Sequence, residues 1–378
     1  MRVNNVIIVY SIIWILAILI YLDKYPNLRQ FLNSIPLKGK NAFGLPYIFT
    51  IIHEVIYFLT NENMLPIVDI TEIFYDISMI ATQNGAADEN YSEGYFENLS
   101  DEEINKMNPR DIENRKFDKM FDLLGAKSGD KILDCGCGTS TFGEYAKTKG
   151  ITVVGITLSS EQVNHAKSKG LLAFRKDFTI EIPEFKNMFD HAVIMGSTEH
   201  VTTGNPTFLS SYKKKADKIS KMLTHVYSYL KPKGRVFMSA LHTNPKFIKR
   251  FELYMICRTY GALLQLDKPG YDLVSSFENS PFKNKLYSRD SSFDYYYVTV
   301  IDDYHFGNAS EFFTPGMKKL LAISCIYPLA FYQYFYYTLG LWMWMWDGKI
   351  HYGANKNYTF EEDKNKRPMT LYWHVYQK

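Results

Sequence analysis

Short apolar runs and amphipathic segments alternate in the middle of the chain. Apolar runs occupy residues 131–135, 152–156, 192–195 and 235–241, lengths typical of buried strands. Apolar positions recur at helical spacing in residues 141–149, 160–169 and 210–230, and Pro232 with Gly234 predicts a turn after the third of these segments. This alternation predicts a doubly wound α/β sheet, to which residues 295–301 and 371–376 add two late strands.

A long apolar stretch lies near the N-terminus. Residues 6–22 carry no charge over 17 positions, the short end of what spans a hydrocarbon core of about 30 Å. No small-residue cleavage site follows, so we expect an uncleaved N-terminal transmembrane anchor rather than a signal peptide. Four basic residues follow the stretch at 24, 29, 38 and 40, against Arg2 before it. The positive-inside rule therefore predicts a single-pass membrane protein whose remaining chain faces the cytosol.

A second apolar stretch covers residues 320–346, without a charged residue over 27 positions. If the strand at 371–376 belongs to the central sheet, a single membrane crossing here would leave that strand on the wrong side. We therefore predict a bent pair of helices in the membrane interface, with Pro328 and Gly340 allowing the bends. A helix pair buried in the protein core is the alternative.

Charge and composition narrow the choice of partners. Lys+Arg number 43 against 40 Asp+Glu, which gives a net charge of +3 without a long basic run, so nucleic acid is not an expected partner. Aromatic residues make up 16% of the chain and gather in its C-terminal third, as expected for contact with apolar or interfacial material. The four cysteines lack the spacing of metal ligands or of a disulfide framework, so we predict no metal site and a reducing compartment.

A glycine-rich turn follows the first predicted strand. Asp134 lies in the end of the strand, Gly136 and Gly138 follow, and a helix begins soon afterwards. Glycine permits positive φ and close approach of a ligand, while a helix start offers N–H groups. The turn lacks the full G-x-G-x-x-G spacing of dinucleotide sites, which favours S-adenosylmethionine over NAD. A tight structural turn without a ligand is the alternative.

Four short motifs in fixed order carry a family resemblance. Residues 155–162, Gly-Ile-Thr-Leu-Ser-Ser-Glu-Gln, resemble V-G-x-T-L-S-x-x-Q, and residues 91–96, Tyr-Ser-Glu-Gly-Tyr-Phe, resemble Y-S-C-A-Y-F. Glu-His-Val at 199–201 and Leu-His-Thr at 241–243 resemble the E-H-V and L-H-T that follow later strands. These motifs make the chain similar to the cyclopropane-fatty-acid and mycolic acid cyclopropane synthases, a family of S-adenosylmethionine-dependent methyltransferases.

The resemblance implies a fold and a cofactor site. The fold is a Rossmann-like class I methyltransferase sheet with a helical cap, to which the N-terminal transmembrane anchor would be added. In this family Thr and Gln side chains replace the acidic residue that most adenosylmethionine folds place after the second strand, and Thr157, Leu158 and Gln162 inherit that role. The complete set of predicted cofactor-binding residues is Tyr91, Ser92, Asp134, Gly136, Gly138, Thr157, Leu158, Gln162 and Phe178.

The resemblance also implies the chemistry. The sulfonium methyl group adds to a cis double bond of an acyl chain, and a base then removes a proton from the resulting carbocation. In the family this base is a bicarbonate held by Cys, Glu, His and Tyr side chains. Glu199 and His242 match two of these positions, whereas Glu93 replaces the Cys and Ser310 replaces the Tyr.

A further anion beside the carboxylates of Glu93 and Glu199 would be repelled, so we predict Glu93, Glu199 and His242 as catalytic residues, with Glu93 replacing the bicarbonate. A solvated loop carboxylate is the alternative for Glu93. For His200, which lies in the Glu-His-Val motif, a satisfied core histidine is the alternative, and His225 is interpreted as structural.

The predicted organisation has six parts. Residues 1–43 form the anchor and linker, 44–125 a helical cap and cofactor-covering segment, 126–245 the S-adenosylmethionine-binding core, 246–319 a substrate cap and late strand, 320–346 the apolar interfacial segment and 347–378 the final strand. The predicted function is C-methylation of unsaturated acyl chains of membrane lipids. A small-amine N-methyltransferase and a catalytically inactive lipid-binding homologue are the alternatives. The sequence leaves the headgroup, the double-bond position, the type of product and the oligomeric state open.

Overall fold

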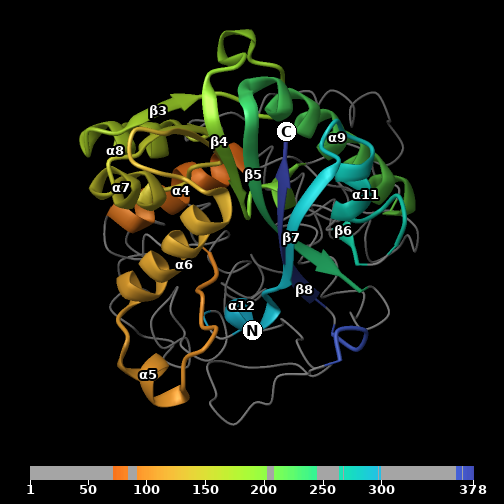
Figure 1. The fold of residues 1–378 in the computed structure, drawn as a ribbon, viewed down its shortest axis with the longest axis horizontal. Coiled ribbons are helices and arrows are strands. Elements are labelled where there is room, and N and C mark those ends of the chain that lie inside the picture. The colour runs from red at the N-terminus through yellow and green to blue at the C-terminus, as the bar shows by residue number, and fades with distance from the viewer. Residues whose placement is uncertain are drawn as a thin grey trace, which may run out of the picture.

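A mixed β-sheet with helices on both faces forms the described part of the protein (Figure 1). The computed structural model describes residues 71–83, 92–201, 208–244, 264–266, 268–296, 298, 363–367 and 369–378. The strands are β1 (Lys131–Cys135), β2 (Thr152–Thr157), β3 (Leu172–Arg175), β4 (Phe189–Met195), β5 (Leu230–Thr243), β6 (Leu264–Gln265), β7 (Asn284–Asp290) and β8 (Met369–Gln377). The helices are α4 (Thr71–Gln83), α5 (Asp101–Lys106), α6 (Pro109–Leu124), α7 (Thr141–Thr148), α8 (Ser160–Ser168), α9 (Phe208–Tyr229), α11 (Leu273–Glu278) and α12 (Ser292–Tyr296), with short 3₁₀ turns η2 (Pro183–Phe185) and η3 (Thr198–His200).

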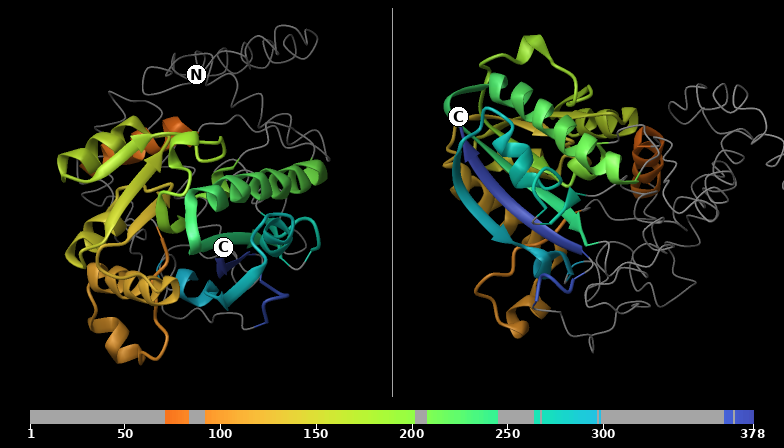
Figure 2. Two further views of the ribbon diagram at one scale, coloured as in Figure 1. Left: turned by 45° about the horizontal axis from the view of Figure 1, so that its top comes forward. Right: turned by 90° about the vertical axis from the view of Figure 1, so that its right-hand side faces the viewer.

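The strands follow the order β3-β2-β1-β4-β5-β8-β7, and β6 pairs with β5 beside this path. Strands β1 to β5 are mutually parallel, whereas β8 runs antiparallel between β5 and β7. Figure 2 shows β8 lying alongside β7 at this side of the sheet. The predicted doubly wound sheet and its four central strands are therefore confirmed, and the predicted strand at 371–376 is the core of β8.

Two apolar cores lie on opposite faces of the sheet, as expected when strand side chains alternate. One core joins Phe117 and Phe142, from α6 and α7, to Phe237 and Trp373. The other packs the apolar face of α9 against the intervening strand positions, among them Met238. This alternation determines which side chains of β5 and β8 can approach one another.

Helix α6 begins and ends at signals in the sequence. The side chain of Asn108 accepts a hydrogen bond from the Asp111 amide at 3.0 Å, and Pro109 occupies the first helical position, where its missing N–H costs nothing. Gly125 ends the helix with φ of +66°, a left-handed conformation that glycine adopts without strain. The helix is thereby fixed beside the glycine-rich turn.

The predicted strand at 295–301 is wrong where it begins, and residues 297 and 299–301 lie outside the described residues. Residues 292–296 form helix α12 rather than the start of a strand at 295–301. Asp290 caps this helix by accepting a 3.0 Å hydrogen bond from the Ser292 amide, and the Arg289–Asp294 ion pair ties it back to β7. The aromatic and β-branched residues after 294 suggested a strand, but these polar contacts favour a helical turn.

The turn predicted at Pro232 and Gly234 is present as an irregularity within β5. Pairing with β4 shifts register between Phe189 and His191, and Lys233 has φ of +66°. Strands β3 and β7, which were not predicted, lie at the two edges of the sheet and expose most of their side chains. β7 lacks a run of apolar residues, and the apolar part of β3 is only three residues long.

Helix α4 is held against the sheet edge by buried polar contacts. Asp76 is 2% exposed and accepts hydrogen bonds from the Ser159 hydroxyl at 2.6 Å and the Glu161 amide at 3.2 Å, at the start of α8. Glu72, from the same helix, pairs with Arg175 of β3 at 2.5 Å. Asp76 thus serves as a cap for a helix that is distant in sequence.

Replacing Asp76 by alanine is expected to loosen α4. The change leaves the Ser159 hydroxyl and the Glu161 amide without their acceptor, at a cost of about 1–3 kcal/mol. Hydrogen exchange should become faster in α4 and the first turn of α8, with less change in α6. Asp76→Asn keeps an acceptor oxygen and should therefore cause a smaller loss of stability and a smaller increase in exchange rate. Equal exchange in wild type and Asp76→Ala would contradict this role.

No helix among the described residues is long and apolar enough to cross a membrane. The predicted anchor at 6–22 and the predicted interfacial segment at 320–346 both lie outside the described residues.

Candidate functional site

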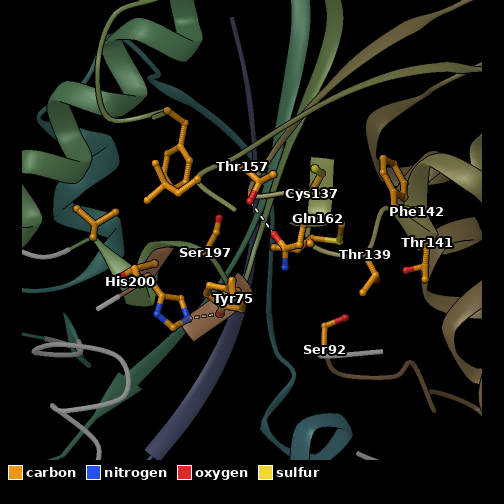
Figure 3. A pocket seen from close by; sticks show the side chains of 18 of the residues that line it. Tyr75, Ser92, Cys137, Thr139, Thr141, Phe142, Thr157, Gln162, Ser197 and His200 are labelled. Atoms are coloured by element: carbon orange, nitrogen blue, oxygen red, sulfur yellow. Dashed lines mark hydrogen bonds between the residues drawn. The ribbon is translucent and has the colours of Figure 1, made fainter. Parts of the chain in front are cut away.

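A pocket opens at the carboxyl ends of β1, β2 and β4, where open α/β sheets usually bind ligands (Figure 3). Its floor includes the glycine-rich turn after β1, Thr157 and Leu158 after β2, and Gly196 and Ser197 after β4. Helix α6 contributes Glu113 and Phe117, and α4 contributes Thr71 and Tyr75. The sheet and two helices that precede it in the chain therefore build the pocket together.

Backbone conformation makes glycine necessary in the turn. Gly136 has φ of +87°, and the amides of Gly136 and Cys137 donate to the Ile156 carbonyl at 2.8 and 3.1 Å, which ties the turn to β2. A Cβ atom at position 136 would lie 2.4 Å from the Ser197 Cβ. Burial raises the pKa of Cys137 to about 12, so its thiol packs as a neutral group. The turn thus presents backbone, rather than side chain, to the pocket.

Thr157 and Gln162 are organised for a ligand on the other side of the pocket. The Thr157 hydroxyl donates to Gln162 Oε1 at 2.7 Å (Figure 3). The backbone amide of Gln162 donates to Ser159 Oγ at 3.1 Å. The side chain of Gln162 is 2% exposed, and within the described residues its Nε2 atom has no hydrogen-bond acceptor. A buried donor of this kind on the pocket wall fits a ribose hydroxyl or another acceptor of a nucleoside. The residues present therefore fit S-adenosylmethionine.

A buried carboxyl group lies beneath the turn. Asp134 is 1% exposed, and burial raises its pKa to about 7 although the Lys116 ammonium acts in the opposite direction. Lys116 is itself fully buried, and its Nζ atom donates to the Ser92 hydroxyl on the pocket wall. The charge state of Asp134 is therefore poised to respond to a cation that enters the pocket.

Most of the predicted cofactor residues gather at this pocket. Those that line it are Ser92, Gly136, Gly138, Thr157, Leu158, Gln162 and Phe178. Asp134 lies directly before the turn, two positions from Gly136, and Tyr91 is outside the described residues. Their contacts with a cofactor stay a prediction.

The three predicted catalytic residues take different partners. Glu93 is buried, not solvated, and Oε1 of its side chain accepts a 2.6 Å hydrogen bond from the Trp373 indole. Glu199 Oε1 accepts from the Leu241 amide at 2.7 Å, and burial raises the pKa of this carboxyl. His242 packs edge-on against Tyr372, with 6.0 Å between ring centroids. All three are buried, but none of them lines the pocket.

Strand alternation separates Glu93 from His242. Trp373, the partner of Glu93, belongs to the core on the α6 face of the sheet. Met238 and His242 are four residues apart on β5, so their side chains point to the same face, and Met238 belongs to the core on the α9 face. The structure therefore does not bring these two side chains to one point, and the hypothesis that Glu93, Glu199 and His242 act on the same charge finds no geometric support.

Sequence reasoning missed several residues of the pocket. Tyr75 and His200 both line it, and the Tyr75 hydroxyl lies 2.5 Å from His200 Nε2. His200 lies in the Glu-His-Val motif but is not among the predicted site residues, and α4 carries no motif that would single out Tyr75. Glu113 and Phe117 recur at i, i+4 on α6, which signals a common helix face but not a ligand.

Comparison with known proteins finds one matching family model and several relatives. Residues 68–253 match the family model of mycolic acid cyclopropane synthetase. A probable fatty acid methyltransferase of Mycobacterium tuberculosis is 29% identical over 107 residues, 26% of this chain and 24% of the relative. A ubiquinone biosynthesis O-methyltransferase of Dechloromonas aromatica is 31% identical over 125 residues, 32% of this chain and 47% of the relative. The chain thus matches about a quarter to a half of the length of these relatives.

Solved structures share the fold. A mycolic acid cyclopropane synthase complexed with SAH and CTAB superposes with a TM-score of 0.55 at 19% identity, covering 80% of this chain and 95% of that chain. A cyclopropane synthase from Mycobacterium tuberculosis gives 0.52 at 15% identity, covering 82% and 100%. The predicted Rossmann-like class I fold is therefore confirmed. The family match confirms the resemblance drawn from the motifs, together with the predicted enzyme class and its cofactor, S-adenosylmethionine.

Proposed function

We propose that this chain, whose residues 68–253 match the family model of mycolic acid cyclopropane synthetase, methylates a carbon atom in unsaturated acyl chains of membrane lipids. The observation that carries the proposal is the pocket at the carboxyl ends of β1, β2 and β4, where the glycine turn and the buried Gln162 amide fit S-adenosylmethionine. The acyl acceptor is supported by relatives named as a fatty acid methyltransferase and, from Escherichia coli, a cyclopropane-fatty-acyl-phospholipid synthase 33% identical over 96 residues.

When bound, S-adenosylmethionine supplies an electrophilic methyl group. The residues of this chain would position it: the turn at Gly136 and Gly138 passes closely along the ligand, and Thr157 and Gln162 form its polar wall. Phe117 and Phe178 add aromatic surface to the pocket, as an apolar acceptor and a cationic intermediate on that acceptor require. Glu93 and Glu199, predicted to act on the departing proton, stay candidates from sequence.

Lipid mass spectrometry tests the proposal. A host with unsaturated phospholipids would express the chain and receive methionine with a fully deuterated methyl group. We expect acyl chains that gain one carbon; a cyclopropane retains two deuterium atoms and a methyl branch retains three. The Gly136→Val variant should give no labelled lipid. Labelled small amines without labelled lipid would favour the N-methyltransferase, and cofactor binding without any labelled product would favour an inactive lipid-binding homologue.

O-methylation of a phenolic acceptor is a second candidate. It rests on the ubiquinone biosynthesis O-methyltransferases among the relatives, one of which matches 125 residues of this chain. Label in a quinone precursor of the host, rather than in acyl chains, would favour this candidate. The same labelled culture measures both outcomes.

A membrane location would bring the pocket to its acceptor. We propose that residues 6–22 anchor the chain and that residues 320–346 add interfacial affinity, with the pocket facing the cytosol. Deletion of residues 1–24 is then expected to release part of the protein from the membrane fraction, with the rest extracted only by detergent. Sedimentation measures this distribution. Complete release without detergent would show that residues 320–346 do not bind the membrane.

A further inference from the structure

Two pocket residues that were not among the predicted site residues form a hydrogen-bonded pair. Tyr75 of α4 and His200 of η3 approach to 2.5 Å between the hydroxyl and Nε2, with the rings edge-on at a centroid separation of 5.0 Å. Figure 3 shows the two side chains pointing toward one another beside the pocket that also holds Thr157 and Gln162. We propose that this pair receives the proton that the acceptor loses during methyl transfer, an inference that rests on the proposed function.

The neighbouring carboxylate is already engaged in a structural role. Glu199 precedes His200 in the chain, but Oε1 of its side chain accepts the Leu241 amide at 2.7 Å and its carbonyl accepts Lys215 Nζ at 2.5 Å. These contacts join η3, which follows β4, to β5 and to α9. His200 therefore presents its ring to the pocket from a loop that Glu199 fixes in place.

Other titratable side chains that line the pocket have different partners or lack a suitable proton acceptor. Glu113 accepts the Thr141 hydroxyl at 2.7 Å and pairs with Arg110 at 2.9 Å. Asp177 accepts both the amide and the hydroxyl of Thr179, at 2.8 and 2.7 Å.

Cys137 is a buried thiol, and burial raises its pKa to about 12, so it stays neutral. Around Tyr75 itself, Asp76 is engaged with Ser159 and Glu72 with Arg175.

The geometry supports a two-step relay. With hydrogen on Nδ1, neutral His200 accepts the Tyr75 O–H hydrogen bond at Nε2, and the tyrosine oxygen itself carries lone pairs that can accept a proton. The π pair of the acceptor forms the new C–C bond as the methyl C–S bond breaks and its electron pair stays on sulfur. A C–H bond of the resulting cation then breaks, and its pair closes the ring or forms a new double bond. The proton goes to Tyr75 as the tyrosine proton passes to His200, which becomes imidazolium and later returns it to water.

Conservative substitutions test the relay. Tyr75→Phe and His200→Gln are expected to lower kcat about 10²–10³-fold, the range for loss of a general base, with less than about threefold change in the affinity for S-adenosylhomocysteine measured by calorimetry. The double variant should be no slower than the slower single variant, because the two groups act as a unit. The matched controls are Tyr145→Phe and His225→Gln, which lie outside the pocket and should keep wild-type kcat.

The pH profile distinguishes a base from a packing role. The kcat of the wild type should fall on the acid side as His200 is protonated, and His200→Gln should lose this limb while keeping its residual rate. Full turnover in either variant would overturn the proposal. The proposal would also be overturned if Glu93→Gln lost turnover while Tyr75→Phe and His200→Gln both kept it, since the proton would then pass to Glu93.

A measurement without turnover separates this inference from the proposed function. In protein with ¹⁵N-labelled histidine and bound S-adenosylhomocysteine, the His200 resonances, assigned by their absence in His200→Gln, should report a neutral ring with hydrogen on Nδ1 and should shift in Tyr75→Phe. If the wild type labels quinones or amines instead of lipids, the lipid proposal fails. Loss of that other activity in Tyr75→Phe and His200→Gln would still support the relay. A ring unaffected by Tyr75→Phe would overturn the relay whatever the acceptor.

Discussion

Replacing Gly136 by valine is expected to abolish S-adenosylmethionine binding, with at least about a hundredfold loss of affinity. The backbone at this position has φ of +87°, where a β-branched residue is strongly disfavoured. The added Cβ would lie 2.4 Å from the Ser197 Cβ, and Ser197 cannot easily retreat because its hydroxyl donates to the Cys135 carbonyl at 2.8 Å. The valine methyl groups would extend into the pocket that Gly136 lines.

A matched control separates backbone strain from loss of the site. Gly129 has φ of +92° and nothing within 4 Å of a built Cβ, and it is not among the pocket residues. Gly129→Ala should therefore lower the free energy of unfolding by about 1–2 kcal/mol and leave cofactor affinity unchanged. Calorimetric titration and denaturant unfolding of both variants measure the two effects. If Gly136→Val kept the wild-type affinity for the cofactor, the assignment of the glycine-rich turn to the cofactor site would be wrong.

Local sequence signals located the cofactor side of the pocket. Gly136, Thr157 and Gln162 lie within a few residues of a strand end, so their positions follow from the strand pattern and the turn alone. Gly155 is constrained in the same local way, because a Cβ atom there would lie 2.7 Å from the Cys137 sulfur. Such constraints are readable from sequence because the atoms involved belong to one turn and the strand beside it.

Contacts between distant segments were not predictable in the same way. Glu93 meets Trp373 across 280 residues, and Tyr75 meets His200 across 125 residues. Motif order placed Glu93 beside Glu199 and His242, but only the pairing of β8 with β5 shows that Trp373 and His242 belong to opposite faces of the sheet. Edge strand β7 escaped prediction for a related reason, because its polar residues reflect exposure rather than pairing.

The affinity for S-adenosylmethionine is expected to rise with pH, about tenfold per pH unit from pH 5 to 7, and to level off above pH 7. Burial raises the pKa of Asp134 to about 7, so at pH 5 the carboxyl group is mostly neutral before the ligand enters. A ligand with a sulfonium and an ammonium group favours the carboxylate and must displace this proton when it binds. Titration calorimetry across this range measures the effect, together with proton release in buffers of different ionisation enthalpy.

Asp134 should affect the stability of the ligand-free protein with the opposite sign. Its pKa is raised from 3.8 to about 7 on folding, so the folded state holds a proton that the unfolded chain has released between these values. Through this group the free energy of unfolding therefore falls, by about 1.4 kcal/mol per pH unit, as pH rises through that window. Asp134→Asn should remove both pH dependences while Lys116 keeps its hydrogen bond to Ser92. A wild-type affinity that does not change between pH 5 and 7 would show that the Asp134 carboxyl does not sense the bound cation.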